Sequence, residues 1–402
     1  MMNKHFDRRQ FLKLNMMLAG SGLVGALPYS KVQADTSANS DRILVVVELS
    51  GGNDGLNSVV PHSNESYYQH RPTIGIKKDK LLAIDDNFGF NPGMLGFKRL
   101  WDRGELAIVH GCGYDNPSFS HFTSMAYMHT AAPNSGEKFG WMGRLADNIS
   151  QQSSPNSLIN IGSTQSLAVN SQFHTPVVFD DPDRFQRNGF LQEKRFLEQV
   201  SKTAHGNPTR AYLNQVAMSA RSSSQQIRQA WAGYETPVDY GIAALDLPKV
   251  AACINAGLPT KLYHVAFRNN AFDTHVQQPA LHRRLLSYAC DSIHGFVRDI
   301  DRLGLSDKVA VLVYSEFGRR VSENANLGTD HGSANVMFFA GKHVKGGHYG
   351  ESPSLTALTD DDNLIHTTDF RQVYATAIDG WLRQQKADQV LKGHYPILPV
   401  FT

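Results

Sequence analysis

One stretch in the last third of the chain constrains the fold more than any other, because it has the pattern of a strand that is buried on both faces. Residues 309–314, VAVLVY, form an unbroken apolar run rich in β-branched side chains. Such runs are typical of parallel sheets covered by helices on both sides. Polar residues follow at 315–320 (SEFGRR) and 329–332 (TDHG). Because ligands of open α/β sheets bind beyond the carboxyl ends of the strands, this stretch predicts a fold class and a site together.

Similar apolar runs recur along the chain and extend the same prediction. They lie at 43–49, 105–111, 263–267 and 335–340. Between 263–267 and 309–314, apolar residues from Leu281 to Ile300 are spaced as on one face of a helix. Strands that alternate with helices predict an α/β fold, with a doubly wound, mostly parallel sheet and helices on both faces. Weaker patterns predict strands at 158–161 and 175–179 and a mainly helical segment at about 190–250.

Composition limits the classes of function. The chain has 402 residues, of which 41% are hydrophobic and 19% charged, and its formal net charge is +2. This length suffices for a large core, and we assign residues 41–402 to one α/β domain. The small net charge and the lack of a Lys/Arg stripe outside the N-terminus argue against nucleic acid as a partner. Cys112, Cys253 and Cys290 form no C-x-x-C pair, so we expect neither a metal knuckle nor a redox pair.

The N-terminus has the features of a signal peptide. Residues 7–13, DRRQFLK, resemble the twin-arginine export signal and precede a weakly apolar segment at 14–27 and a small-residue site at 32–34. We therefore expect residues 1–34 to engage the twin-arginine export machinery and the mature protein to be periplasmic or extracellular. The apolar segment is short and rich in glycine, so no stable membrane span is expected in the mature chain.

Polar residues follow the first predicted strand. Residues 50–57, SGGNDGLN, contain glycines that let the backbone turn sharply and approach a ligand. Glu48 and Asp54 flank this turn, and the pattern leaves open which of them is the acid at the end of the first strand. The alternative interpretation is a glycine-rich turn in which Asn and Asp serve only as turn formers.

A candidate nucleophile follows the strand at 105–111. Ser120 and His121 stand where the sequence predicts the start of a helix that runs through His129. A serine at this position commonly caps the helix through its side chain. The same position also suits a nucleophile, because the helix dipole and free backbone N–H groups favour an anionic oxygen. Both interpretations stay open at the level of sequence.

Carboxylates and imidazoles accumulate at the ends of the later predicted strands. The spacing Asp273-x-His275 places both side chains on one side of an extended loop, which suits a shared ligand. Carboxylate and imidazole together suit Zn²⁺, Mn²⁺, Mg²⁺ or Ca²⁺, and the imidazoles favour Zn²⁺ or Mn²⁺. The alternative is a Glu–Arg surface pair and a turn with an incidental His. The candidate metal ligands are Asp54, Asp273, His275, Glu316, Asp330 and His331.

Several motifs resemble one family. They are SGGNDGLN at 50–57, SHF at 120–122, GWMGR at 140–144, SEFGRR at 315–320 and TDHG at 329–332. Together they resemble the domain of unknown function 1501 family, whose members are twin-arginine-exported and similar to alkaline phosphatases and sulfatases. The resemblance implies a doubly wound sheet whose strand ends hold one or two divalent metals and a nucleophile.

The resemblance also implies roles for individual residues. Ser120 stands where that superfamily has its nucleophile, and Asp273 and His275 stand where it has an Asp…His ligand pair. Glu316 takes the place of its acid after a strand, and His331 that of its last His ligand. Glu316-Phe317 replaces the expected Asp-His, which removes one imidazole and leaves one metal or none as the alternatives. No C-x-P-x-R motif occurs, so the formylglycine nucleophile of common sulfatases is absent.

Two functional hypotheses follow. The first is an exported, metal-dependent hydrolase of phosphate or sulfate esters that takes a small anionic substrate. In it Ser120 is the nucleophile, His121 or His331 transfers protons, and Arg144 or Arg319 balances anionic charge. The second is a non-catalytic exported binding or assembly protein that keeps the fold with a degenerate site. Convergence of the candidate residues in space would favour the first.

Overall fold

The computed structural model describes residues 41–150, 156–185 and 208–402. All of these residues belong to one compact unit, residues 39–402. The predicted signal peptide at 1–34 lies outside the described residues, as does the part of the expected helical segment up to residue 207. The rest of that segment contains two helices, α8 (Pro208–Ala232) and α9 (Leu247–Asn255).

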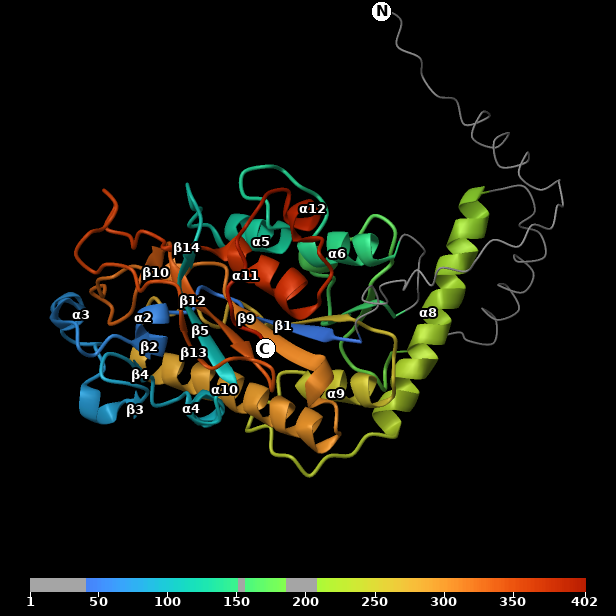
Figure 1. The fold of residues 1–402 in the computed structure, drawn as a ribbon, viewed down its shortest axis with the longest axis horizontal. Helices are drawn as coiled ribbons and strands as arrows, with labels where there is room; N and C mark the ends of the chain where they lie inside the picture. The colour runs from blue at the N-terminus through green and yellow to red at the C-terminus, as the bar shows by residue number, and fades with distance from the viewer. Residues whose placement is uncertain (1–40, 151–155, 186–207) are drawn as a thin grey trace, which may run out of the picture. The chain divides into compact units, whose positions relative to one another are not determined.

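A twisted central sheet organises the described chain (Figure 1). In the described residues it has nine strands in the order β13-β5-β12-β9-β1-β8-β6-β7, with β14 also paired to β5. Only β12 runs antiparallel to the others, so the predicted α/β class with a mostly parallel sheet is confirmed. The strands are β1 (Ile43–Leu49), β5 (Leu106–Gly113), β6 (Leu158–Ile161), β7 (Val177–Phe179), β8 (Leu262–Phe267), β9 (Val309–Tyr314), β12 (Asn335–Ala340), β13 (Gly347–Tyr349) and β14 (Thr368–Asp369).

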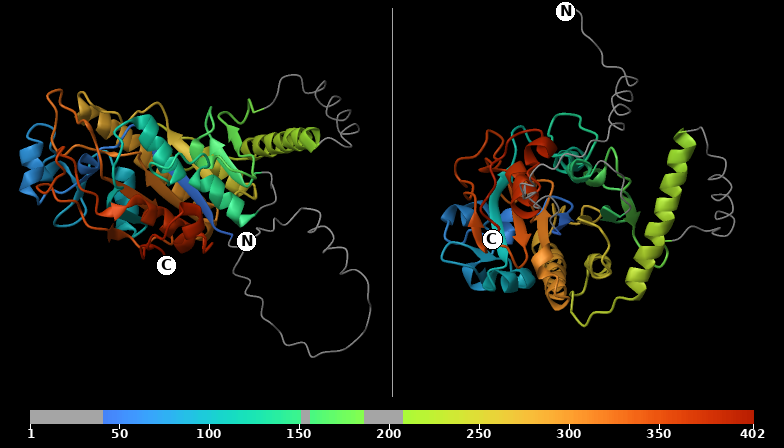
Figure 2. Two further views of the ribbon diagram at one scale, coloured as in Figure 1. Left: turned by 90° about the horizontal axis from the view of Figure 1, so that it is seen from above. Right: turned by 45° about the vertical axis from the view of Figure 1, so that its right-hand side comes forward.

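Helices cover both faces of the sheet, as the doubly wound prediction requires (Figures 1 and 2). One face is covered by α4 (Leu95–Asp102), α9 and α10 (Gln278–Arg302). The other is covered by α5 (His121–Thr130), α6 (Trp141–Ile149), α11 (Phe370–Ala375) and α12 (Ala387–Leu391). A 3-10 helix and a π-helix, η3 (Leu167–Val169) and η5 (Thr376–Trp381), also lie on this second side.

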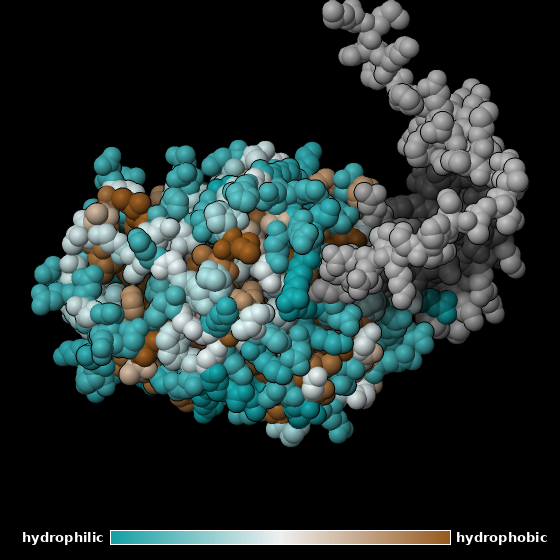
Figure 3. All heavy atoms as spheres, in the orientation of Figure 1, coloured by the Kyte–Doolittle hydropathy of each residue, from teal (hydrophilic) through white to brown (hydrophobic). Residues whose placement is uncertain are grey.

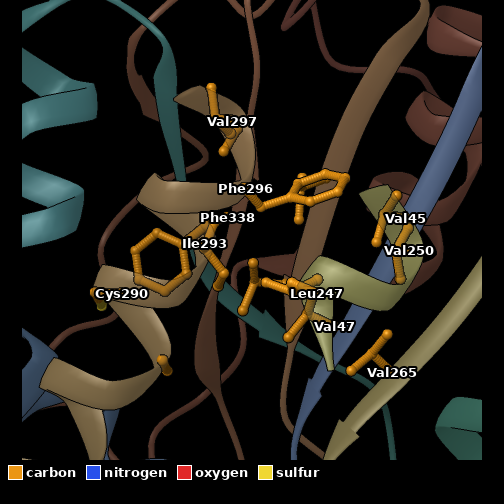
Figure 4. Close-up of a cluster of buried hydrophobic side chains, with 14 of the residues drawn as sticks. Val45, Val47, Leu247, Val250, Val265, Cys290, Ile293, Phe296, Val297 and Phe338 are labelled. Atoms are coloured by element: carbon orange, nitrogen blue, oxygen red, sulfur yellow. The ribbon is translucent and has the colours of Figure 1, made fainter. Parts of the chain in front are cut away.

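Alternation along the central strand explains why two separate cores form. In β1, Val45 and Val47 pack on one face while Leu44 and Val46 pack on the other, and all four are fully buried. Figure 4 shows Val45 and Val47 beside side chains of α9 and α10. Successive side chains of a strand point to opposite faces, so a strand that is apolar throughout requires cover on both sides.

Shorter elements complete the described chain. A small antiparallel sheet is formed by β2, β4 and β3, and a two-stranded one by β10 and β11. Their bounds, with those of the remaining short helices, are α2 (Gly55–Ser58), β2 (Val59–Val60), α3 (Glu65–His70), η2 (Lys78–Lys80), β3 (Leu82–Ala83), β4 (Gly89–Phe90), η4 (Ser306–Lys308), β10 (Gly318–Arg319) and β11 (His331–Gly332).

The sheet brings five loops to one edge. The carboxyl ends of β1, β5, β8 and β9 share this edge because the four strands run in the same direction. β12 runs the other way, so the segment that enters it, 331–334, starts from the same edge. This arrangement gathers the loops after Leu49, Gly113, Phe267 and Tyr314 with the loop before Asn335, where the candidate residues lie.

The surface of the described residues is largely polar. In Figure 3 hydrophilic residues dominate the visible face, and apolar ones occur in small separate groups. None of the helices described is both long enough and apolar enough to cross a membrane.

Candidate metal centre

Four side chains from three loops meet at this edge, and we call them the outer cluster: His121, Asp273, His275 and His331. Asp273 Oδ1 lies 2.9 Å from His275 Nε2 and 3.2 Å from His331 Nε2, while its Oδ2 lies 3.3 Å from His121 Nε2. The two Nε2 atoms of His275 and His331 are 2.9 Å apart. Ligand atoms of His121, Asp273 and His331 all lie within 4.8 Å of one another. The structure therefore brings together three of the predicted metal ligands and a predicted catalytic histidine.

Each member is positioned by local structure. His121 is the first residue of α5, so its ring emerges at the helix N-terminus. Asp273 and His275 follow β8 on the loop that leads into α10. His331 lies in β11 and pairs with Arg319 of β10, which comes directly after β9. The three segments are distant in sequence and meet because the ends of β5 and β8 and the start of β12 lie at one edge of the sheet.

Each histidine of the outer cluster has its other ring nitrogen against an oxygen acceptor. His121 Nδ1 lies 2.7 Å from Glu316 Oε1, and His275 Nδ1 lies 3.1 Å from Asp330 Oδ1. His331 Nδ1 lies 2.7 Å from the carbonyl oxygen of Phe119. A carbonyl or an ionised carboxylate can only accept a hydrogen bond, so each Nδ1 must donate one. In the neutral rings the three Nε2 atoms then carry lone pairs.

These lone pairs face one another and a carboxylate. The 2.9 Å contact between His275 Nε2 and His331 Nε2 is repulsive unless a cation or a proton lies between them. His121 Nε2 is buried and has no hydrogen-bond partner. A metal supported by His and carboxylate, with the opposite ring nitrogen held by an acceptor, has this arrangement of donors. The residues present therefore fit a divalent metal.

The local charge points in the same direction. Asp273, Glu316 and Asp330 are three carboxylates, and Arg319 is the cation in contact with Asp273. With neutral histidines this set carries a formal excess of two negative charges, which one divalent cation balances. Partial burial alone would raise the pKa of Asp273, but the hydrogen bond and charge of Arg319 outweigh it and lower that pKa to about 2. Asp273 is thus an anion over the whole physiological range.

Glu316 lies behind a histidine of the cluster instead of among the converging ligand atoms. It is 1% exposed, and its carboxylate accepts hydrogen bonds from the backbone N–H of Gly51 and from Ser315 Oγ as well as from His121. The hydrogen bond to Glu316 raises the pKa of His121, although burial opposes this. Glu316 therefore orients the His121 ring. Asp330 occupies the same position relative to His275, with one oxygen also accepting from Asn324.

Arg319 is buried and its donors are already used. It donates to the carbonyl oxygens of Gly51, Gly52, Phe272 and Thr329 and to Asp273 Oδ1. These contacts tie the loops after β1 and β8 to β10. Arg319 therefore fixes Asp273, and each nitrogen of its guanidinium donates to an oxygen of the protein.

Ser120 lies between two residues that both contact the outer cluster. The carbonyl of Phe119 accepts from His331, and the ring of His121 lies against Asp273. Ser120 is the N-cap residue of α5, but its side chain makes no capping hydrogen bond, and the residue is exposed. The cap interpretation of Ser120 therefore lacks the side-chain hydrogen bond that it requires.

Two predicted residues are held by other partners. Asp54 is fully buried at the N-terminus of α2, where its carboxylate pairs with Arg71 at 2.7 Å and accepts from Gln278. Burial opposes ionisation of Asp54, but the charge of Arg71 prevails and its pKa is lowered. Arg144 is buried too, and its guanidinium donates to the carbonyl oxygens of Thr130, Phe139 and Val390. The structure does not bring either residue into the outer cluster.

A second group, which we call the inner cluster, was missed from sequence: Glu48, His129 and His264. Their ligand atoms also lie within 4.8 Å of one another, and all three residues are buried. Glu48, left open as the alternative to Asp54, belongs to this group and not to the outer cluster. His264 stands inside an apolar strand and His129 near the end of α5, where an imidazole is easily taken for a core residue. The sequence does not show that Val46 pairs with His264, and this register is what brings His264 close to Glu48.

Comparison of the sequence with known families decides the identity. The family described as "Protein of unknown function (DUF1501)" matches residues 41–379. The chain belongs to this family. The match covers all four residues of the outer cluster and all three of the inner one. No curated protein matches the DUF1501 chain in sequence.

Several solved structures are weakly similar to this DUF1501 protein. A complex of Ps i-CgsB with k-i-k-neocarrahexaose has a TM-score of 0.40 and 11% identity, with 88% of this chain and 74% of that one covered. An alkaline phosphatase superfamily protein from Vibrio parahaemolyticus has a TM-score of 0.37 and 8% identity over 78% and 63% of the two chains. The C-terminal periplasmic domain of EcEptC from Escherichia coli, in complex with Zn, has a TM-score of 0.37 and 11% identity over 78% and 76%.

Proposed function

We propose that this DUF1501 protein is an exported, metal-dependent hydrolase of phosphate or sulfate esters, with the outer cluster as its metal centre and Ser120 as its nucleophile. One observation carries the proposal. Three imidazoles with acceptor-bound Nδ1 atoms direct their Nε2 atoms at a single ionised carboxylate, Asp273, on the surface side of the sheet edge. Such a set of donors is costly to assemble without a cation.

The chemistry needs few groups beyond those described. When bound, a divalent metal supplies a Lewis acid for an ester oxygen and lowers the pKa of an adjacent hydroxyl or water. Ser120 stands at the N-terminus of α5, where the helix dipole and free N–H groups favour negative charge. The contacts of Phe119 and His121 with the cluster hold the backbone on both sides of Ser120. These contacts fix the backbone of Ser120 next to a residue of the outer cluster.

Glu316, Asp330 and Arg319 position the other groups. Glu316 and Asp330 accept the Nδ1 protons of His121 and His275 and keep both rings turned towards Asp273. Arg319 holds Asp273 by a hydrogen bond of 2.7 Å while its remaining donors fix the surrounding loops. Such preorganisation keeps the site from rearranging as charge develops on a reacting ester.

Metal content and turnover measured together test the proposal. We expect purified protein reconstituted with Zn²⁺ or Mn²⁺ to hydrolyse p-nitrophenyl phosphate or p-nitrophenyl sulfate. His331→Ala should lose the metal of the outer cluster and at least about 100-fold in turnover, because a three-ligand remainder is weak and misshapen. His394→Ala, which removes an exposed histidine paired with Asp388, is the matched control and should change neither quantity.

A second variant separates the nucleophile from the metal. Ser120→Ala should keep the metal but lose at least about 100-fold in turnover, and should cost little stability because Ser120 makes no capping hydrogen bond. Wild-type protein that stays inert with Zn²⁺, Mn²⁺, Mg²⁺ and Ca²⁺ would favour the non-catalytic binding protein instead. Equal turnover in Ser120→Ala and wild type would leave a water as the nucleophile.

Export forms the remaining part of the proposal. The pair Arg8-Arg9 at the start of a weakly apolar, glycine-containing segment supports passage through the twin-arginine machinery and a periplasmic or extracellular location. Substitution of both arginines by lysine should leave the precursor in the cytoplasm, as judged by fractionation. Lys13→Arg, which keeps the pair intact, should be exported normally. Unchanged export of the double-lysine variant would refute this part alone.

A further inference from the structure

The inner cluster lies within the folded core, on the side of the sheet that α5 covers. Glu48 is near the end of β1, and His264 on the neighbouring β8 is its diagonal neighbour on the same face, because Val46 pairs with His264. His129 reaches the same point from the last turn of α5. The three side chains are exposed by 4%, 2% and 7% respectively.

All contacts within the inner cluster converge on one oxygen. Glu48 Oε2 lies 2.6 Å from His129 Nε2 and 3.4 Å from His264 Nε2, and it accepts a hydrogen bond of 2.8 Å from the Tyr314 hydroxyl. A carboxylate that is ionised in the core needs a compensating cation.

His264 shows that the inner cluster lacks a partner for one of its ring nitrogens. Its Nε2 is buried, points at the carboxylate and has no hydrogen-bond partner. Buried ring nitrogens without a partner are rare and costly, and each calls for an explanation. An Nε2 lone pair directed at a carboxylate oxygen and a second imidazole is what a metal ligand presents before the ion binds.

We propose that Glu48, His129 and His264 bind a second divalent metal ion of the zinc class, which ties β1, β8 and α5 together. This site is independent of the proposed hydrolase centre. Two imidazoles and a carboxylate are donors that Zn²⁺ prefers, and the imidazoles disfavour Ca²⁺ and Mg²⁺. In a tetrahedral zinc site, neighbouring ligand atoms are about 3.3 Å apart. The 3.4 Å between Glu48 and His264 already matches, and the contact between Glu48 and His129 must open by about 0.7 Å.

The surroundings indicate a structural ion and not a catalytic one. All three ligands are at least nine-tenths buried, and Tyr314 donates to the ligating oxygen from β9, as a supporting residue around a metal does. A site with no open side has no place for a substrate. The ion would instead balance the charge of the buried Glu48 carboxylate through coordination bonds and stabilise the centre of the sheet.

Metal stoichiometry tests the inference. Wild-type protein reconstituted with Zn²⁺ and freed of loose metal should contain two equivalents by elemental analysis. His264→Gln should contain one equivalent and melt at a lower temperature, yet keep its outer-cluster metal. His331→Ala should also contain one equivalent but keep the melting temperature near that of the wild type. His282→Gln is the matched control, because His282 is equally buried with an unpartnered Nδ1 but belongs to neither cluster, and it should retain both ions.

The outcomes separate this inference from the proposed function. One equivalent in wild type, lost in His331→Ala and kept in His264→Gln, overturns the second site and leaves the hydrolase centre standing. One equivalent, lost in His264→Gln and kept in His331→Ala, supports the second site and removes the metal from the hydrolase proposal. If His264→Gln does not fold, the metal content of His331→Ala decides. One remaining equivalent of metal supports the inner site, and no remaining metal overturns it.

Discussion

The two histidine clusters occupy opposite ends of one helix and differ in what surrounds them. α5 begins with His121 in the outer cluster and carries His129 of the inner cluster in its last turn. In the outer cluster each imidazole is backed by a separate acceptor, and Asp273 is partly open to solvent. In the inner cluster the imidazoles converge on one carboxylate in the core, and one of them lacks a hydrogen bond.

This difference shows how position in the fold separates chemistry from stability when the residue types are the same. Loops at the strand ends leave one side of the outer cluster accessible, which a substrate requires. The inner cluster is built from strands and a helix interior, where access is closed. We therefore expect the outer cluster to control turnover and the inner cluster to control the free energy of unfolding.

Chelation should produce the largest contrast between the clusters. Incubation of the folded protein with EDTA should remove the outer ion quickly and reduce turnover at least about 100-fold, with little change in the melting temperature. The inner ion should leave only on the time scale of unfolding, because its ligands are buried. Elemental analysis at successive times checks this, and release of both ions in a single fast phase would show that the inner cluster is not closed.

Substitution of the supporting carboxylates should give the next largest effect. Glu316→Gln should weaken metal binding by about 10- to 100-fold, because the amide places donors against the Gly51 N–H and the Ser315 hydroxyl. Asp330→Asn should weaken it less, since the Asp330 side chain is 54% exposed and its amide oxygen can still accept from His275. Competition titration with a chromophoric chelator measures both affinities. Equal losses in the two variants would contradict the assignment of Glu316 as the main support.

Removal of one hydroxyl should affect only the inner cluster. Tyr314→Phe deletes the hydrogen bond to Glu48 and should cost about 2 kcal/mol of unfolding free energy, because the acceptor is charged. Tyr374→Phe is the control, since its hydroxyl donates to the neutral carbonyl of Met128, and it should cost about 1 kcal/mol. Denaturant unfolding measures both values. Turnover should stay unchanged in both variants, and its loss in Tyr314→Phe alone would mean that the clusters are coupled.

A buried histidine outside both clusters serves as the reference for them. Burial lowers the pKa of His282 to about 4, although nearby Asp54 opposes the shift. The unfolded chain protonates this residue near pH 6.5 and so binds more protons than the folded chain between about pH 6.5 and 4. Stability should therefore fall as pH decreases through that window, by at most about 1.4 kcal/mol per pH unit. His282→Gln should flatten this dependence in denaturant unfolding, and an unchanged slope would contradict the low pKa.

Much of the fold could be predicted because its strands are recognisable as apolar runs in the sequence. The expected strands at 158–161, 309–314 and 335–340 coincide with β6, β9 and β12. Position along parallel strands also predicts which loops share an edge, so Asp273, His275 and His331 could be grouped without coordinates. These inferences need only hydrophobic periodicity and strand direction.

The roles of individual side chains at the edge could not be predicted in the same way. Glu316 faces His121 across 195 positions of sequence, and that contact depends on how two loops fold around Gly51. Asp54 looks like a ligand until α2 and Arg71 are in place. Glu48 and His264 meet only through a register between β1 and β8, which hydrophobic pattern leaves undetermined. Local sequence patterns do not determine these contacts between residues that are far apart in sequence.

The pairing of β1 with β8 and β9 has a consequence for the order of events during synthesis. β1 is among the first described segments to leave the ribosome, yet its two partners begin at Leu262 and Val309. An apolar strand with both edges unpaired must wait for more than half of the chain, which slows folding and invites aggregation. The residues of the outer cluster are complete only after His331 has been made, so a metal bound there would load late in synthesis or after it. A nascent chain of this kind benefits from a holding chaperone until its last sheet strands are made.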